Sequence, residues 1–193
     1  GGMDSTGIMA VPYNALKAHL GIEGGRTQVY DTMQQVVKVE PRVLGAVGGD
    51  VVNLSFEPRK WRDAVLPDGS PCQVPEKWMP EALPDGVEVV RDREGNVTMR
   101  RLEGSFYFEP VYAPLAGIAE PTELAGYGEE IEGFDLPFYA DETLEEMGER
   151  ARGLYETTDR AIMGCFIGHV FMGGQLLRGF DNFLMDLVAN PAL

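Results

Sequence analysis

The clearest pattern of apolar and polar positions lies in residues 160–188. Residues 160–166 form a short apolar run, which is typical of a strand covered on both faces, as in a parallel sheet. A glycine-rich loop is expected to follow, up to Gly174. Beyond it, apolar residues recur at helical spacing and predict an amphipathic helix with one wide apolar face. These residues are Leu176, Leu177, Phe180, Phe183, Leu184, Leu187 and Val188.

Other segments carry clear local signals. Residues 11–20 predict a helix that begins near Pro12, and residues 50–54 predict a second buried strand. Residues 143–157 predict a helix, because Thr143 and Glu146 have capping-box spacing. The order of strand, helix and strand is typical of βα units, so an α/β fold is expected.

The middle of the chain has a different character. Prolines and glycines crowd residues 57–84, which we interpret as an irregular excursion with turns at residues 67–69 and 84–86. Residues 87–91 and 97–102 then predict a β-hairpin. Its outer positions are charged, which favours an exposed flap over a core sheet. Residues 105–112 are expected to add a third strand or to pack aromatic side chains beneath this flap.

The composition limits the possible function classes. The chain has 193 residues, 44% of them hydrophobic, which is enough for one globular domain with a sizeable core. Its formal charge of −15 argues against a broad surface for nucleic acid or anionic membranes, and we attribute the acidity to solubility. Widely separated Cys72 and Cys165, with no signal-peptide or membrane-span pattern, favour the cytoplasm.

Several polar residues are candidates for a binding site. Cys165 and His169 lie at a strand end, where α/β folds bind ligands, but this pair alone is too small a ligand set for zinc. We therefore expect a buried thiol and a histidine bonded to the backbone. Arg178 either pairs with Asp181 or Asp186 or binds an anion in a pocket. No Walker A, GxGxxG, GxSxG or HExxH pattern is present, so no sequence motif identifies a reaction.

Three segments resemble the uroporphyrinogen decarboxylase-like superfamily, above all its methyltransferase-like, corrinoid-dependent branch. They are DSTGI at residues 4–8, DVVNL at 50–54 after VEPRVLGAVGG, and LLRGFDNFLMDLVANPAL at 176–193. The hairpin region at residues 57–112 also resembles an insert of that branch. The similarity covers nearly all of the chain.

This resemblance implies a fold and an activity. The family fold is a (β/α)8 TIM barrel, and the chain resembles its N-terminal half, as one partial barrel domain over residues 1–193 with an inserted β-hairpin flap. The implied reaction is methyl transfer between a small methylated substrate or thiol and a corrinoid protein. A zinc ion held by the barrel's second half would activate the thiol or the substrate. No metal ligand is carried over to this chain, which alone is expected to be inactive.

The resemblance also suggests where a small-molecule substrate lies. The matching positions are the loop at residues 4–6 and the pocket wall at residues 164–174. The residues expected near the substrate, with Arg178 added, are Asp4, Ser5, Thr6, Gly168, His169, Phe171 and Arg178. No catalytic residue is assigned.

Two other functions remain open. Decarboxylation of a porphyrinogen or another carboxylate is one, although residues 53–56 lack the aspartate and the N-terminal loop lacks the arginines of the true decarboxylases. A non-catalytic half-barrel that serves as a binding or assembly module is the other. Either further polypeptide or a second copy in a homo-oligomer is expected to cover the open sheet edge.

Overall fold

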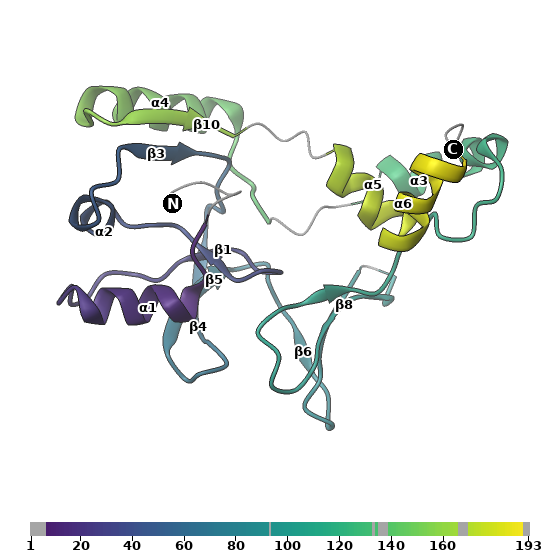
Figure 1. The fold of residues 1–193 in the computed structure, drawn as a ribbon, viewed down its shortest axis with the longest axis horizontal. Helices are drawn as coiled ribbons and strands as arrows, with labels where there is room; N and C mark the ends of the chain where they lie inside the picture. Colours follow the sequence, from purple (N-terminus) through teal and green to yellow (C-terminus); the bar gives the residue numbers. More distant parts are fainter. Residues whose placement is uncertain (1–6, 93, 133, 135–138, 166–169, 191–193) are drawn as a thin grey trace. The chain divides into compact units, whose positions relative to one another are not determined.

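The computed structural model describes residues 7–92, 94–132, 134, 139–165 and 170–190, and it combines helices with short strands (Figure 1). The helices are α1 (Ala10–His19), α2 (Pro41–Ala46), the 3-10 helix η2 (Pro121–Gly126), α3 (Gly128–Glu132), α4 (Leu144–Thr157), α5 (Val170–Arg178) and α6 (Phe180–Ala189). The strands are β1 (Val29–Asp31), β2 (Val36–Val37), β3 (Val51–Leu54), β4 (Trp61–Val65), β5 (Pro71–Pro75), β6 (Glu81–Ala82), β7 (Glu88–Arg91), β8 (Val97–Arg101), β9 (Glu109–Pro110) and β10 (Ala161–Gly164).

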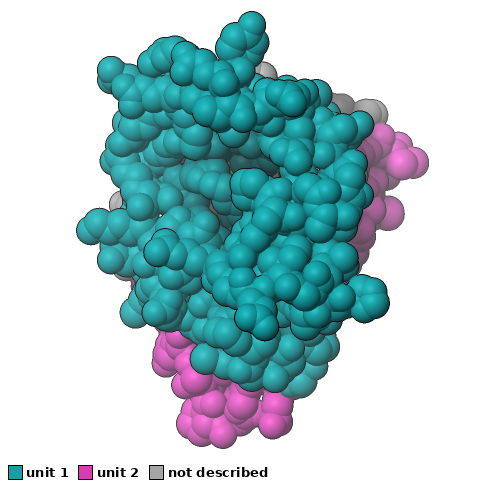
Figure 2. Space-filling model, turned by 90° about the vertical axis from the view of Figure 1, so that its left-hand side faces the viewer, with its two compact units in different colours: residues 1–79, 104–107, 137–166 teal, residues 80–103, 108–136, 167–193 magenta. Residues whose placement is uncertain are grey.

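The chain divides into two compact units, which are coloured separately in Figure 2. Unit 1 comprises residues 1–79, 104–107 and 137–166. Unit 2 comprises residues 80–103, 108–136 and 167–193. The region expected as an insert, residues 57–112, is divided between the two.

Helix α1 contributes Ala10 and Tyr13 to the core of unit 1. The helix predicted at residues 11–20 is confirmed, with Pro12 in its first turn, where a missing N–H costs nothing. Tyr13 is fully buried and donates its hydroxyl to Glu40, which also accepts from Lys17 Nζ over 2.6 Å. Buried apolar residues of this unit include Ala10, Tyr13, Val29, Val36, Val37, Val43, Leu44, Cys72, Val74, Trp78 and Met147.

Strands β3 and β10 form the parallel pair of unit 1, with Val51 opposite Ala161 and Leu54 opposite Gly164. The two predicted strands are thus confirmed. Their complete burial is wrong, because β3 is half-buried and most of β10 is exposed. The physical reason is that, among the described residues, each strand has only the other as a neighbour, in a two-stranded sheet.

The antiparallel hairpin of β4 and β5 replaces the irregular structure expected for residues 57–84. The turn expected at residues 67–69 is present, and Gly69 has a φ of 83°, a left-handed conformation that suits glycine. Strand β5 has a proline at each end, Pro71 and Pro75. Because proline usually argues against a strand, the sequence did not predict β5.

Unit 2 contains a four-stranded antiparallel sheet in the order β6–β7–β8–β9. The predicted hairpin is confirmed as β7 and β8, and β9 is the additional strand. Charged pairs such as Arg91–Glu81 cross the sheet, while Val89, Val90 and Met99 are buried. The hairpin therefore contributes to a core as well as to the surface. Among the described residues, no sheet closes into a barrel.

Helices α5 and α6 occupy the stretch expected to be a loop and a single helix. Helix α5 begins at Val170. The prediction of a loop up to Gly174 is therefore wrong for residues 170–174. Gly179, with a φ of 85°, separates the two helices. Gly174 lies so close to the Phe183 ring that a Cβ there would come within 2.3 Å of it. The missing side chain thus lets α6 approach α5.

Candidate small-molecule site

Only part of the expected substrate site can be placed. Phe171 and Arg178 lie on α5. The remaining expected residues lie outside the described residues, namely Asp4, Ser5, Thr6, Gly168 and His169.

Phe171 joins α5 to α6 through an aromatic contact. Its ring meets the Phe183 ring edge to face, with the centroids 5.3 Å apart. More than half of the Phe171 side chain is nevertheless exposed. Edge-to-face geometry is a favoured arrangement for such rings, so this pair helps to hold the two helices together.

Arg178 ends α5 and is held by several acceptors. Its Nε donates to Asp186 Oδ2 over 2.6 Å, and its Nη1 donates to the carbonyl of Leu115 over 2.7 Å and to that of Ala116 over 3.1 Å. The hydrogen bond from Arg178 is the main cause that lowers the pKa of Asp186. Of the two interpretations left open by the sequence, the structure contains the ion pair with Asp186. Nη2 donates to none of the described residues.

A pocket of about 250 Å³ lies beside this ion pair, entirely within unit 2. Helices α5 and α6 form one side, and residues 115–124 supply the other. Its lining residues are Leu115, Ile118, Leu124, Gly174, Leu177, Arg178, Phe183, Asp186, Leu187 and Asn190. Apolar walls with a few polar groups are the usual composition of a small-molecule site.

The lining limits the chemistry that this pocket can perform. Its described residues include no cysteine, histidine, serine or lysine, which are common nucleophiles and proton carriers. Asp186 has a lowered pKa and is already paired, so it stays an anion. The polar side chains that the described lining offers are the Arg178–Asp186 pair and the amide of Asn190.

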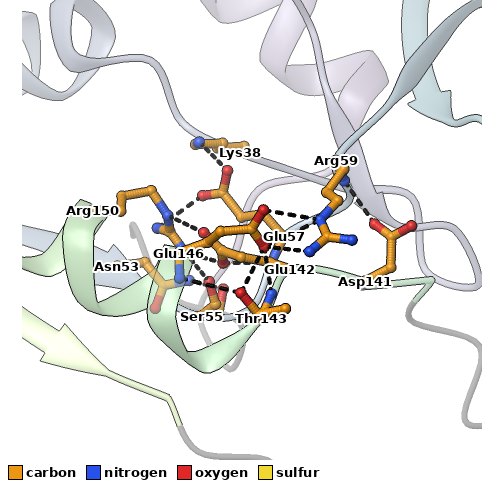
Figure 3. A network of polar contacts seen from close by, with 10 residues as sticks. All are labelled: Lys38, Asn53, Ser55, Glu57, Arg59, Asp141, Glu142, Thr143, Glu146 and Arg150. Atoms are coloured by element: carbon orange, nitrogen blue, oxygen red, sulfur yellow. Dashed lines mark hydrogen bonds and ion pairs between the residues drawn. The ribbon is translucent and has the colours of Figure 1, made fainter.

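A second polar arrangement lies in unit 1, where β3 ends and α4 begins (Figure 3). Arg150 donates to Glu142 through Nε and Nη2, over 3.0 and 2.7 Å, and to the carbonyl of Ser55. Its Nη1 lies 3.1 Å from Glu57 Oε1. Lys38 pairs with the other oxygen of Glu57 over 2.6 Å.

The same network continues along α4. Arg59 pairs with Glu146 over 2.7 Å, and the Arg59 backbone N–H donates to Asp141 over 2.8 Å. The hydrogen bond from Arg59, aided by those from Thr143, lowers the pKa of Glu146 to about 2. Because each of these cations has a carboxylate partner, we interpret the network as structural. It fixes the carboxyl end of β3 against α4.

Sequence reasoning missed this network for a simple reason. Arg59 and Glu146 are 87 residues apart, and no sequence motif links the two. The capping-box pair Thr143 and Glu146 was a usable local signal, and it is present, with Glu146 N–H donating to Thr143 Oγ1 over 3.3 Å.

The end of β10 carries Cys165, one of the two candidate metal ligands of the sequence. Cys165 follows this strand directly, and its N–H donates to the carbonyl of Leu54 over 2.9 Å. Among the residues whose positions are described, no group of three or more His, Cys, Asp or Glu side chains is arranged to hold a metal ion. His169 is not among them.

Comparisons with protein-family models, with curated proteins and with solved structures found no match to this chain. Within the described part of the chain, no helix combines the length and the apolar character that crossing a membrane requires.

Proposed function

We propose that this chain is the N-terminal barrel part of a uroporphyrinogen decarboxylase-like enzyme that transfers a methyl group between a small methylated substrate or thiol and a corrinoid protein. The proposal rests first on the three sequence segments that resemble the methyltransferase-like branch. The cysteine content favours a cytoplasmic enzyme.

One geometric observation supports the proposal most directly. Strands β3 and β10 pair in parallel, and the chain between them includes α4, which leads directly into β10. A parallel pair needs such a crossover connection, and repeated crossovers of this kind build (β/α)8 barrels. One of the resembling segments, residues 50–54, contains β3.

The pocket of unit 2 is the proposed substrate site, since Arg178 lines it and Phe171 lies on the same helix. In this proposal the chain binds and orients the substrate through the apolar walls and the Arg178–Asp186 pair. Zinc, when bound by the complete enzyme, supplies Lewis-acid activation. The described residues offer no ligand set for zinc.

The test is methyl transfer by the complete gene product that contains this chain. The purified protein is mixed with zinc, with cob(I)alamin and with a panel of methylated small compounds, and methylcobalamin is followed by its absorbance. Formation of methylcobalamin that stops when zinc is chelated is the expected result. Release of carbon dioxide from carboxylate compounds, with no methylcobalamin formed, would show a decarboxylase instead.

A further inference from the structure

We propose that the pocket of unit 2 selects a neutral, mostly apolar molecule of about single-ring size that carries one hydrogen-bond acceptor. That this molecule is the enzyme's substrate rests on the proposed function. The class of molecule itself rests only on the geometry of the pocket.

The size of the pocket sets the size of the occupant. Its volume is about 250 Å³. An apolar cavity of about 150 Å³ holds benzene, whereas sites for drug-sized ligands span roughly 300–1,000 Å³. The occupant should therefore be one ring, or an aliphatic group of that size, with a short substituent.

The ion pair sets the charge of the occupant. Arg178 lies 2.6 Å from Asp186, and the two side chains are 14% and 12% exposed, so together they present no net charge in a shielded place. An anion added beside them would leave one uncompensated negative charge among apolar walls, which is costly. The chain's charge of −15 adds repulsion over a longer range. The pocket thus disfavours carboxylates, although an arginine lines it.

A further donor of Arg178 sets the polar group of the occupant. Arginine has no acceptor atoms, and Nη2 of Arg178 donates to none of the residues that the structure describes. A carbonyl or ether oxygen can accept from this nitrogen without bringing a charge. The ion pair to Asp186 and the bonds to Leu115 and Ala116 hold the guanidinium in place for this contact.

Three probes of similar size separate these properties: acetophenone, ethylbenzene and benzoate. Binding to the 193-residue chain is measured by NMR titration, without any turnover. Acetophenone should bind about three- to tenfold more tightly than ethylbenzene, the effect of one hydrogen bond. Benzoate should bind most weakly. Tightest binding of benzoate, equal binding of all three, or no binding of acetophenone would each overturn the proposal.

Two variants on α6 locate the site. Leu187 lines the pocket and Met185 does not, and both side chains are more than half exposed. Leu187→Trp should weaken acetophenone binding about tenfold or more by filling the space, whereas Met185→Trp should leave it unchanged. Equal effects of the two variants would contradict the assignment. Circular dichroism verifies that each variant is folded.

A double variant tests whether Nη2 of Arg178 is the donor to the bound molecule. Arg178→Met with Asp186→Leu removes both charges together, so neither is left unpaired. Ethylbenzene should still bind, and the preference for acetophenone should disappear. A preference that persists would exclude Nη2 as the donor. Because binding is read without turnover, failure of methyl transfer alone would refute the proposed function and leave the ligand class intact.

Discussion

Arg150 donates to Glu142 across the first turns of α4, over 3.0 Å from Nε and 2.7 Å from Nη2. The same guanidinium reaches Glu57 beyond the end of β3, with Nη1 3.1 Å from Oε1. Glu57 and Glu142 therefore share one cation, although 85 residues separate them. The contact connects two parts of unit 1 that no local signal links.

Replacement of Arg150 by methionine should destabilise the protein. It would leave two half-buried carboxylates, Glu57 and Glu142, beside each other without their shared cation. We expect the free energy of unfolding to fall by about 1–3 kcal/mol, less than for a fully buried pair because water still reaches these groups. Urea denaturation followed by circular dichroism measures the change.

The matched control is Arg152→Met, two positions further along α4, where the side chain is exposed. It should change the free energy of unfolding by less than about 0.5 kcal/mol. Equal losses for Arg150→Met and Arg152→Met would show that the network contributes nothing beyond a generic charge effect.

Low pH should lower the stability of unit 1, because Glu146 becomes protonated. Its pKa lies at about 2 in the folded protein and near 4.5 when unperturbed, chiefly because Arg59 hydrogen-bonds to it. A lowered carboxylate pKa means that stabilisation is complete above pH 4.5 and is lost as the pH falls towards 2. Unfolding midpoints in urea at pH 6, 4.5 and 3 should therefore decrease in that order.

Glu146→Gln tests this cause directly. In this variant the urea midpoint should fall less between pH 4.5 and pH 3 than in the unmodified protein. In Glu145→Gln, at the exposed neighbouring position, the midpoint should fall as much as in the unmodified protein. Asp141 also has a lowered pKa, mainly through the hydrogen bond from the Arg59 backbone, so some decrease should remain. An unchanged pH profile in Glu146→Gln would refute the assignment.

Elements with local signals were predictable from the sequence. The α1 helix has Pro12 in its first turn, and α4 has the Thr143–Glu146 capping box. The β7–β8 hairpin has a glycine, Gly95, with a φ of 90° in its turn. Each of these signals acts within a few residues, so periodicity and turn chemistry are sufficient to find them.

Features that depend on distant residues were not predictable. The network around Arg150 pairs residues far apart in sequence, and the burial of β10 depends on which strands lie beside it. Arg178 was identified as a pocket residue, but the opposite wall comes from residues 115–124. No pattern in the sequence links these residues to α5. The break at Gly179 was missed because apolar spacing continues across it.

Gly179→Ala should be destabilising. The residue has a φ of 85° and a ψ of 140°, in a region that is unfavourable for any residue with a Cβ. A Cβ would meet nothing closer than 3.6 Å, so the cost is backbone strain rather than a clash. We expect the free energy of unfolding to fall by about 1–3 kcal/mol. Urea denaturation measures it.

Gly173→Ala is the matched control for that substitution. Gly173 lies within α5, and a Cβ there would meet no atom within 4 Å. Alanine in a helix is more favourable than glycine, so this variant should be more stable by about 0.5–1 kcal/mol. The two glycine substitutions should thus have opposite signs, and a loss of stability in both would contradict the proposed role of Gly179.

Cys72 should resist alkylation in the folded protein. Its side chain is buried, with 6% of the residue exposed, and burial raises the pKa of the thiol to about 11. Because the thiolate is the reactive form, the rate of reaction follows the ionised fraction, which at pH 8 is about 0.1% for this thiol and about a quarter for an ordinary thiol. Alkylation by iodoacetamide, followed by peptide mass spectrometry, should therefore be at least ~100-fold slower in the native protein than in urea.

The urea sample provides the reference for this measurement, since unfolding exposes Cys72 and returns its pKa to the ordinary range. The native rate should also rise steeply between pH 8 and pH 10, because each unit brings about ten times more thiolate. A native rate equal to the rate in urea would mean that β5, which contains Cys72, opens readily. A slow rate without pH dependence would instead identify access of the reagent as the limiting factor.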